Sequence, residues 1–97
     1  MKIGVLGTGM VGDAIASKLV SLGREVMMGS RTANNEKAVH WAGKFGPKAT
    51  HGKFADAAAF GELVFNCTEG SHTLDALKLA GEGNLEGKIL IDVSNPL

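Results

Sequence analysis

This chain lacks several features that would assign it to whole classes of protein. Its 97 residues carry ten Lys and Arg against ten Asp and Glu, so the formal net charge is zero. The basic excess typical of a nucleic-acid binder is therefore missing. With no tyrosine and one tryptophan, binding of single-stranded nucleic acid by stacked aromatic side chains is not expected. No apolar run approaches the roughly 18 residues of a membrane span, and the apolar run at the N-terminus is too short for a signal peptide.

Cysteine is also scarce. Cys67 is the only one, so no internal disulfide forms, and a reducing, cytoplasmic compartment is the simplest interpretation. Cys67 and the three histidines, His40, His51 and His72, show no close ligand spacing of the kind that zinc sites use. We therefore expect no metal site.

What the chain does have is an alternation of strand and helix patterns. Short apolar runs predict strands at residues 3–6, 25–28, 48–53, 62–67 and 88–93. Apolar residues at three- and four-residue spacing predict helices at 10–22, 36–45, 55–60 and 71–80, with a loop at 81–87. This order predicts one α/β domain over residues 1–97: a Rossmann-like, doubly wound parallel sheet of about five strands, in the order 3-2-1-4-5.

Caps and buried faces of these helices are also predictable. Asn34 or Asn35 is suited to cap the second helix, and Ser71 the last one. In that last helix, we expect an inward face made of Leu74, Leu77, Leu79 and Ala80.

A glycine-rich turn follows the first strand and opens the first helix. It matches G-x-G-x-x-G over Gly7, Thr8, Gly9, Met10, Val11 and Gly12. In that context the motif is typical of dinucleotide binding, because Gly7 permits the tight turn, Gly9 lets a pyrophosphate approach the backbone, and Gly12 lets the helix pack on the sheet. The amides at the start of the helix then attract the phosphates. The alternative is a glycine-rich turn that binds nothing.

The end of the second strand separates NAD from NADP. NAD-binding proteins usually place an acidic residue there, which bonds the ribose 2′-hydroxyl. Here the segment Gly29-Ser30-Arg31-Thr32 holds no carboxylate. Arg31 offers a charged fork and Ser30 and Thr32 offer hydroxyls to a 2′-phosphate, and Thr8 is placed to reach the same group. We therefore predict an NADP pocket, against the alternative of a solvated turn with an ordinary surface arginine.

Two further turns are expected at the same edge of the sheet, since ligands of open α/β sheets lie beyond the carboxyl ends of the strands. Cys67 and Thr68 follow the fourth strand, and Asn95 follows the fifth. Thr68 and Asn95 are candidates to bond the carboxamide or ribose of the cofactor, or they are ordinary loop residues. Cys67 could serve as a nucleophile activated by His72, but a small core residue is the better interpretation. We expect Trp41 to pack on the sheet rather than stack on adenine.

The segments at residues 1–12 and 23–31 resemble the NADP-binding half of the NADPH-dependent coenzyme F420 reductases, and more distantly the N-terminal domain of pyrroline-5-carboxylate reductases. The resemblance covers essentially the whole chain and is looser at residues 66–68 and 92–97. It implies hydride transfer between NADPH and an acceptor such as the deazaflavin coenzyme F420. It also implies that Thr8, Ser30, Arg31 and Thr32 hold the 2′-phosphate. Proteins of that family are longer, and their remaining part completes the acceptor pocket.

Three functions follow from these observations. The leading one is the NADP(H)-binding domain of an oxidoreductase, in which the cofactors carry the chemistry and no strong protein acid or base is required. The second is a binding or sensing module without catalysis. The third is a structural unit that forms a homodimer through an exposed sheet edge. The expected partner is the nucleotide cofactor, with neither a nucleic acid nor a membrane.

Overall fold

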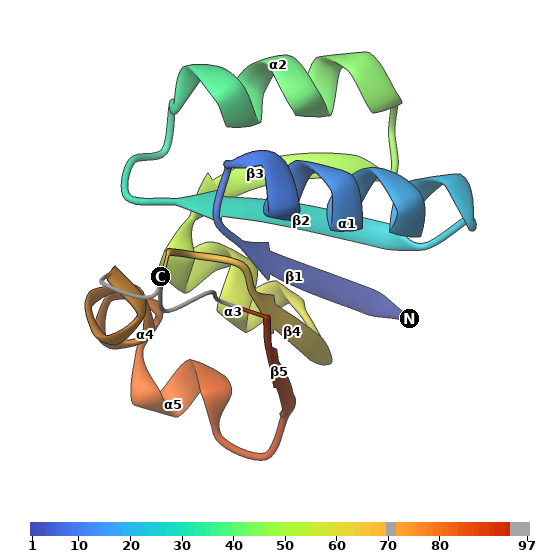
Figure 1. Ribbon diagram of the computed structural model, residues 1–97. Coiled ribbons are helices and arrows are strands. Elements are labelled where there is room, and N and C mark those ends of the chain that lie inside the picture. The colour runs from blue at the N-terminus through green and yellow to red at the C-terminus, as the bar shows by residue number, and fades with distance from the viewer. Residues whose placement is uncertain (70–71, 94–97) are drawn as a thin grey trace.

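The computed structural model describes residues 1–69 and 72–93, and its centre is a five-stranded sheet. The strands are β1 (Lys2–Leu6), β2 (Glu25–Ser30), β3 (Ala49–Lys53), β4 (Leu63–Asn66) and β5 (Ile89–Asp92). They lie in the order β3-β2-β1-β4-β5, and every neighbouring pair is parallel. The predicted fold class and strand order are confirmed. The carboxyl ends of all five strands therefore meet at one edge of the sheet (Figure 1).

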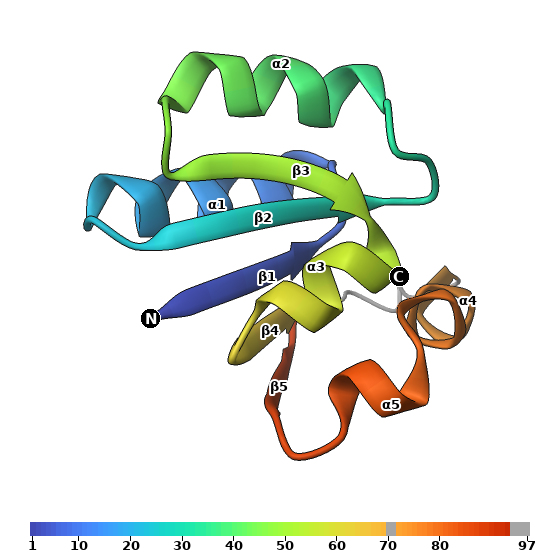
Figure 2. The same cartoon turned by 180° about the vertical axis from the view of Figure 1, so that it is seen from behind.

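The helices divide between the two faces of the sheet. Helices α1 (Met10–Ser21) and α2 (Glu36–Phe45) lie on one face, and α3 (Phe54–Phe60), α4 (Thr73–Ala80) and α5 (Glu82–Leu85) lie on the other (Figures 1 and 2). Two buried apolar clusters, one under each layer, fill the spaces between helices and sheet. At 12 residues, α1 is the longest helix. In the described part of the chain, no helix has the length and apolar character that crossing a bilayer requires.

Trp41 is the largest side chain of the α1 and α2 layer, and it is 1% exposed. Its ring lies 5.8 Å from the ring of Phe45, and its indole Nε1 donates to the hydroxyl of Ser17 at 3.2 Å. Asn35 caps the start of the same helix, accepting from the amide of Ala38 at 3.1 Å. Trp41 also belongs to the buried cluster that contains Val5 and Met28 of the sheet, so it packs on the sheet, as expected, and it fixes α2 against α1 as well.

Helix α3 lies unusually close to the sheet, and glycines make this possible. A Cβ atom on Gly4 of β1 would lie 2.3 Å from the carbonyl oxygen of Ala57, and one on Gly29 of β2 would lie 2.8 Å from the Cβ of Ala57. No side chain fits between the helix and these strands. The small residues Ala57 and Ala58 are accordingly fully buried.

Three details of the sequence prediction are wrong. Gly29 and Ser30 continue β2 rather than begin a turn. Gly29 is a glycine because α3 packs closely against the strand at this point, and not because the chain turns there. Within the predicted loop at 81–87 lies the four-residue helix α5, which is too short to show a period. Leu74 and Leu79 are exposed, at 73% and 49%, because α4 instead buries the small residues Ala76 and Ala80. The predicted capping residue Ser71 lies outside the described residues, and the N-cap of α4 is His72.

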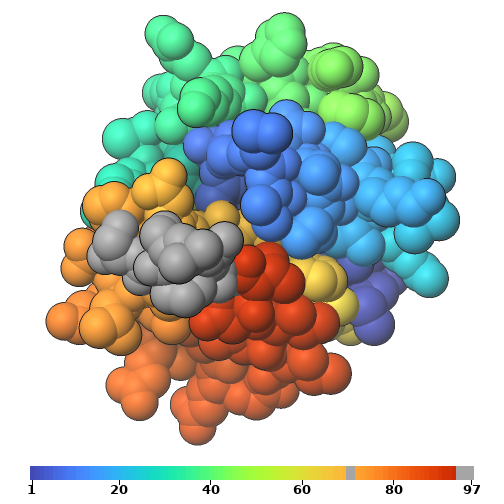
Figure 3. Space-filling model, viewed as in Figure 1, coloured from blue at the N-terminus to red at the C-terminus, as the bar shows by residue number. Residues whose placement is uncertain are grey.

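Strand β5 forms one edge of the sheet, and all four of its residues are exposed (Figure 3). Ile89 is the most exposed of its apolar side chains, at 67%. An apolar edge strand of this kind is a usual site of pairing with another strand. Homodimer formation through this edge stays a prediction.

Candidate functional site

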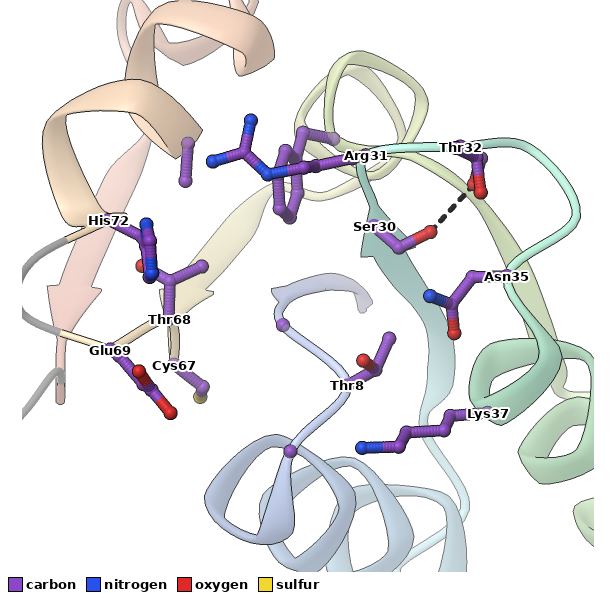
Figure 4. Close-up of a pocket in the computed structure, with 14 residues that line it drawn as sticks. Thr8, Ser30, Arg31, Thr32, Asn35, Lys37, Cys67, Thr68, Glu69 and His72 are labelled. Atoms are coloured by element: carbon purple, nitrogen blue, oxygen red, sulfur yellow. Dashed lines mark hydrogen bonds between the residues drawn. The ribbon is translucent and has the colours of Figure 1, made fainter.

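A cavity of about 510 Å³ opens at the carboxyl edge of the sheet, where β1 and β4 lie side by side (Figure 4). The glycine turn forms its floor through Gly7, Thr8 and Gly9. Its two walls come from the loop after β2 with the start of α2 and from the loop after β4 with α4. They contain Ser30, Arg31, Thr32, Asn35, Lys37, Cys67, Thr68, Glu69, His72 and Ala76, and Phe54 at the start of α3 completes the lining. A larger depression of about 910 Å³ on α4 and α5 contains no residue of the glycine turn.

The first and third glycines of the turn are required by the fold itself. Gly7 has φ +121°, a conformation that side chains rarely adopt, and a Cβ on it would lie 2.9 Å from the carbonyl oxygen of Cys67. A Cβ on Gly12 would lie 2.5 Å from the carbonyl oxygen of Gly7. These two residues let the chain turn out of β1 and let α1 approach the sheet.

The second glycine is different. A Cβ on Gly9 would meet no atom of the described residues within 4 Å, and its φ of −77° suits any residue. None of the described contacts therefore requires a glycine here. The open space above Gly9 belongs to the cavity, and a glycine at this place of the motif would let a pyrophosphate approach the backbone.

Gly9 is also the N-cap of α1, and it has no side chain that could cap the helix. The first bond of the helix runs from the amide of Asp13 to the carbonyl of Gly9 at 2.9 Å. The amides of Met10, Val11 and Gly12 precede that bond and have no partner inside the helix. Free amides and the positive end of the helix dipole together form a site suited to phosphate groups.

The loop after β2 provides a wall without a carboxylate. Ser30 is 5% exposed, and its hydroxyl donates to the carbonyl of Thr32 at 2.6 Å, which closes the loop (Figure 4). Arg31 points across the cavity from this loop. Among the described residues that line the cavity, Glu69, on the opposite wall, is the only acidic one.

Lys37 adds a second positive charge that the sequence analysis did not identify. Its side chain extends from the first turn of α2 toward the start of α1 (Figure 4). It lines both the main cavity and a neighbouring hollow of about 390 Å³ over Thr8, Gly9 and Met10. A lysine in the first turn opposes the helix dipole, so the helix itself does not favour this residue there.

The loop after β4 is held by a fully buried amide. Asn66 accepts from the Thr68 hydroxyl at 2.7 Å and from the Thr68 amide at 3.3 Å, and it donates to Asp92 at 3.4 Å. Because the Thr68 hydroxyl proton is used in this bond, the oxygen meets a ligand as an acceptor. The loop is thereby fixed to the ends of both β4 and β5.

Cys67 has the properties of a core residue. It is 9% exposed, and burial, with the charge of Asp92 adding to it, raises the pKa of its thiol to about 11 from an ordinary value of 9.0. A thiol with this pKa is protonated at neutral pH, which argues against the nucleophile hypothesis. Within residues 1–69 and 72–93, no three His, Cys, Asp or Glu side chains are grouped so as to hold a metal ion.

Most of the predicted site residues meet at this edge. Those that line the main cavity are Gly7, Thr8, Gly9, Ser30, Arg31, Thr32, Cys67 and Thr68. Met10 and Val11 line an adjoining hollow of about 400 Å³, which shares Gly9, Cys67 and Thr68 with the cavity and reaches Val93 after β5. Gly12 is buried beneath the turn, and Asn95 lies outside the described residues. The main cavity and this adjoining hollow together extend from the end of β2, across the glycine turn, to the end of β5.

Sequence reasoning missed several cavity residues: Asn35, Lys37, Phe54, Glu69, His72 and Ala76. Asn35 was identified as a cap, and His72 only as a neighbour of Cys67. For Lys37 alone, the sequence contained a usable signal of its role. It is a lysine in the first turn of α2, the helix after the loop that was expected to hold the 2′-phosphate, and a lysine is unfavourable at that end of a helix.

Comparisons with known proteins show what this chain is similar to. Over 95 residues, the chain is 37% identical to the metalloreductase STEAP3 of Rattus norvegicus. The match covers 98% of this chain and 18% of that protein. A structure from Arthrobacter sp. FB24, named as a candidate F420-dependent NADP-reductase, is 45% identical with a TM-score of 0.87 and covers 100% of this chain and 46% of that one. Pyrroline carboxylate reductase of Plasmodium falciparum, at 15% identity, 97% of this chain, 33% of that one and a TM-score of 0.71, shows the shared fold.

The chain spans less than half the length of each of these proteins. The family described as "NADP oxidoreductase coenzyme F420-dependent" matches residues 2–96, which is nearly the whole chain. This chain belongs to the NADP oxidoreductase, coenzyme F420-dependent, family.

Proposed function

We propose that this chain is the NADP(H)-binding domain of an oxidoreductase that exchanges hydride between NADPH and a deazaflavin, coenzyme F420. One observation carries the proposal. A single cavity joins a phosphate-binding turn, open above Gly9, to a wall that presents Arg31 and no carboxylate. The acceptor is taken from the family, whose description names coenzyme F420.

The residues divide the cofactor among them. The amides at the start of α1 would hold the pyrophosphate, close to Gly9. Arg31, with the hydroxyls of Thr8 and Thr32, would hold the 2′-phosphate, and Lys37 adds positive charge on the same side. The Ser30 hydroxyl already donates its proton to the carbonyl of Thr32, so Ser30 orders the loop. Arg31 and Lys37 supply the positive charge for the phosphate.

The path toward β5 suits the nicotinamide end. Bound NADPH supplies the hydride, and the protein supplies position and a dry surface. Cys67 and Thr68 border this part of the path, where the Thr68 oxygen can accept from the carboxamide or a ribose hydroxyl. We assign the same kind of contact to Asn95, since it follows β5.

Calorimetric titration with NADPH and NADH tests the binding half of the proposal. Replacing Arg31 by Ala should weaken NADPH binding about tenfold or more, the loss expected for a charge-assisted contact, and should change NADH binding little. Arg24→Ala is the matched control, because this exposed arginine precedes β2 at the other end of the strand. Unchanged NADPH affinity in Arg31→Ala would contradict the 2′-phosphate assignment.

Oxidation of NADPH in the presence of coenzyme F420 tests the catalytic half. Turnover that depends on the deazaflavin would support the reductase. NADPH binding without turnover would favour the second hypothesis, a binding module that needs further polypeptide or has no catalytic role. That outcome has a structural rationale, since the matched Arthrobacter protein is more than twice as long.

A further inference from the structure

The arginine assigned to the 2′-phosphate already has a partner in the protein. Arg31 Nη2 lies 3.7 Å from Oδ2 of Asp75. Arg31 belongs to the loop after β2, whereas Asp75 lies in the first turn of α4, the helix that borders the opposite wall of the cavity. Figure 4 shows the guanidinium pointing across the cavity toward the helix that begins after His72. The ion pair therefore bridges the two walls.

We propose that Asp75 competes with the 2′-phosphate of the cofactor for Arg31, and that it thereby limits how strongly the site prefers NADPH over NADH. This inference rests on the proposed function, because it requires the 2′-phosphate to bind at Arg31. Asp75 is a specificity-determining residue in this scheme. It does not line the cavity, and it acts on a phosphate held by Arg31, both by pairing with that arginine and by its own negative charge beside it.

The competition follows from charge and exposure. Both side chains are more than half exposed, at 53% for Arg31 and 62% for Asp75, so the pair is weak and easily broken. A phosphate carries nearly two negative charges and matches the planar fork of a guanidinium better than a single distant carboxylate oxygen does. A phosphate at Arg31 would also lie close to the Asp75 carboxylate and be repelled by it.

The effect has the same direction in both possible bound arrangements. If the phosphate displaces Asp75, binding includes the loss of the ion pair. If the guanidinium keeps Asp75 and binds the phosphate with its other N–H groups, the two anions repel each other. Either way, the carboxylate opposes the phosphate-bearing cofactor. NADH has no 2′-phosphate, so it is unaffected.

Affinities of the Asp75→Asn variant for NADPH and NADH test the inference. The variant should bind NADPH about two- to fivefold more tightly, the range of an exposed ion pair, with NADH affinity unchanged. Glu82→Gln is the control, because it removes one surface carboxylate from α5, outside the cavity. It should change neither affinity. In an Arg31→Ala background, Asp75→Asn should lose most of its effect.

Two results would overturn the inference: unchanged NADPH affinity in Asp75→Asn, or weaker binding, which would show that Asp75 positions Arg31. The Arg31→Ala variant shows which claim has failed. If NADPH affinity is unchanged in that variant too, the proposed 2′-phosphate site is wrong. If NADPH affinity falls in that variant, only the role of Asp75 is wrong. Trp41 fluorescence checks that each variant is folded. If Asp75→Asn is not, Asp75→Ser repeats the test, since serine also suits the first turn of a helix.

Discussion

A side-chain carbon on Gly12 would lie 2.5 Å from the carbonyl oxygen of Gly7, so the first and third glycines of the turn depend on each other. Gly9, between them, has no atom of the described residues within 4 Å of the same position. The motif thus contains two glycines that the fold requires and one that no described contact requires, as expected if a ligand approaches the backbone there. This difference can be measured.

Gly9→Ala should abolish most NADPH binding and leave the fold nearly intact. The added methyl group occupies the space of the pyrophosphate, while loss of a glycine N-cap costs below about 1 kcal/mol of unfolding free energy. Gly12→Ala should instead cost about 1–3 kcal/mol, because the methyl group meets backbone. Denaturant unfolding followed by the single tryptophan, Trp41, together with NADPH titration, separates the two effects.

A Gly9→Ala protein that binds NADPH as well as the wild type would show that no phosphate approaches this backbone. Loss of stability as large as that of Gly12→Ala would show that Gly9 has a structural role after all.

Asn66→Ala should reduce both stability and cofactor affinity. The Asn66 amide is fully buried and fixes Thr68 through two hydrogen bonds. Its removal leaves buried polar groups without partners and costs about 1–3 kcal/mol. The loop after β4 then loses its fixed position on the cavity, so NADPH binds more weakly. Asn84→Ala is the matched control. Asn84 lies on α5, away from the cavity, and donates to the carbonyl of Ala80 at the end of α4, so its replacement should leave affinity unchanged.

Lys37→Gln should weaken NADPH binding about three- to tenfold without destabilising the protein. In the described part of the chain the Lys37 ammonium forms no ion pair, and it points into the region assigned to the phosphates. Removing a cation from the positive end of α2 slightly favours the helix. Because the contribution is electrostatic, it should shrink as salt is added.

Titrations at low and high salt provide the check, with Lys44→Gln at the far end of the same helix as the control. Equal affinities of Lys37→Gln and the wild type at low salt would exclude Lys37 from the site.

The general plan of the fold was predictable because each strand and helix carries its own local pattern. The alternation of short apolar runs with amphipathic segments predicts the parallel sheet, and the glycine turn after the first strand indicates the dinucleotide-binding fold whose strand order the sheet has. In two places, tertiary packing made the prediction of a residue's structural role wrong. Gly29 resembles a turn residue but is a strand residue pressed against Ala57. Leu74 resembles a core residue, yet the close approach of α4 to its neighbours buries the smaller Ala76 instead.

The site divides in the same way. The glycine turn and the Ser30-Arg31 segment were recognisable because the fold determines where they must lie. Lys37, Glu69 and His72 were not, because their place on the cavity depends on the course of two loops. The ion pair between Arg31 and Asp75 joins residues 44 positions apart and has no local pattern.

The raised pKa of Cys67 gives a prediction for both reactivity and pH. With a pKa of about 11, the folded thiol should react slowly with iodoacetamide at neutral pH, and unfolding should speed the reaction. Between pH 9 and 11 the unfolded chain loses the thiol proton while the folded chain keeps it. Stability therefore falls as pH rises through this window, by at most about 1.4 kcal/mol per pH unit from this group.

Comparison with Cys67→Ala isolates the effect from the titration of lysines over the same range. The variant should lack the thiol's share of the stability loss above pH 9, and its NADPH binding should persist, because the thiol acts as a small core group. Rapid alkylation of the folded wild type near pH 7 would show that the thiolate is present there. That result would restore the nucleophile hypothesis. It would mean that burial of Cys67 between β4 and the glycine turn does not keep the thiol protonated.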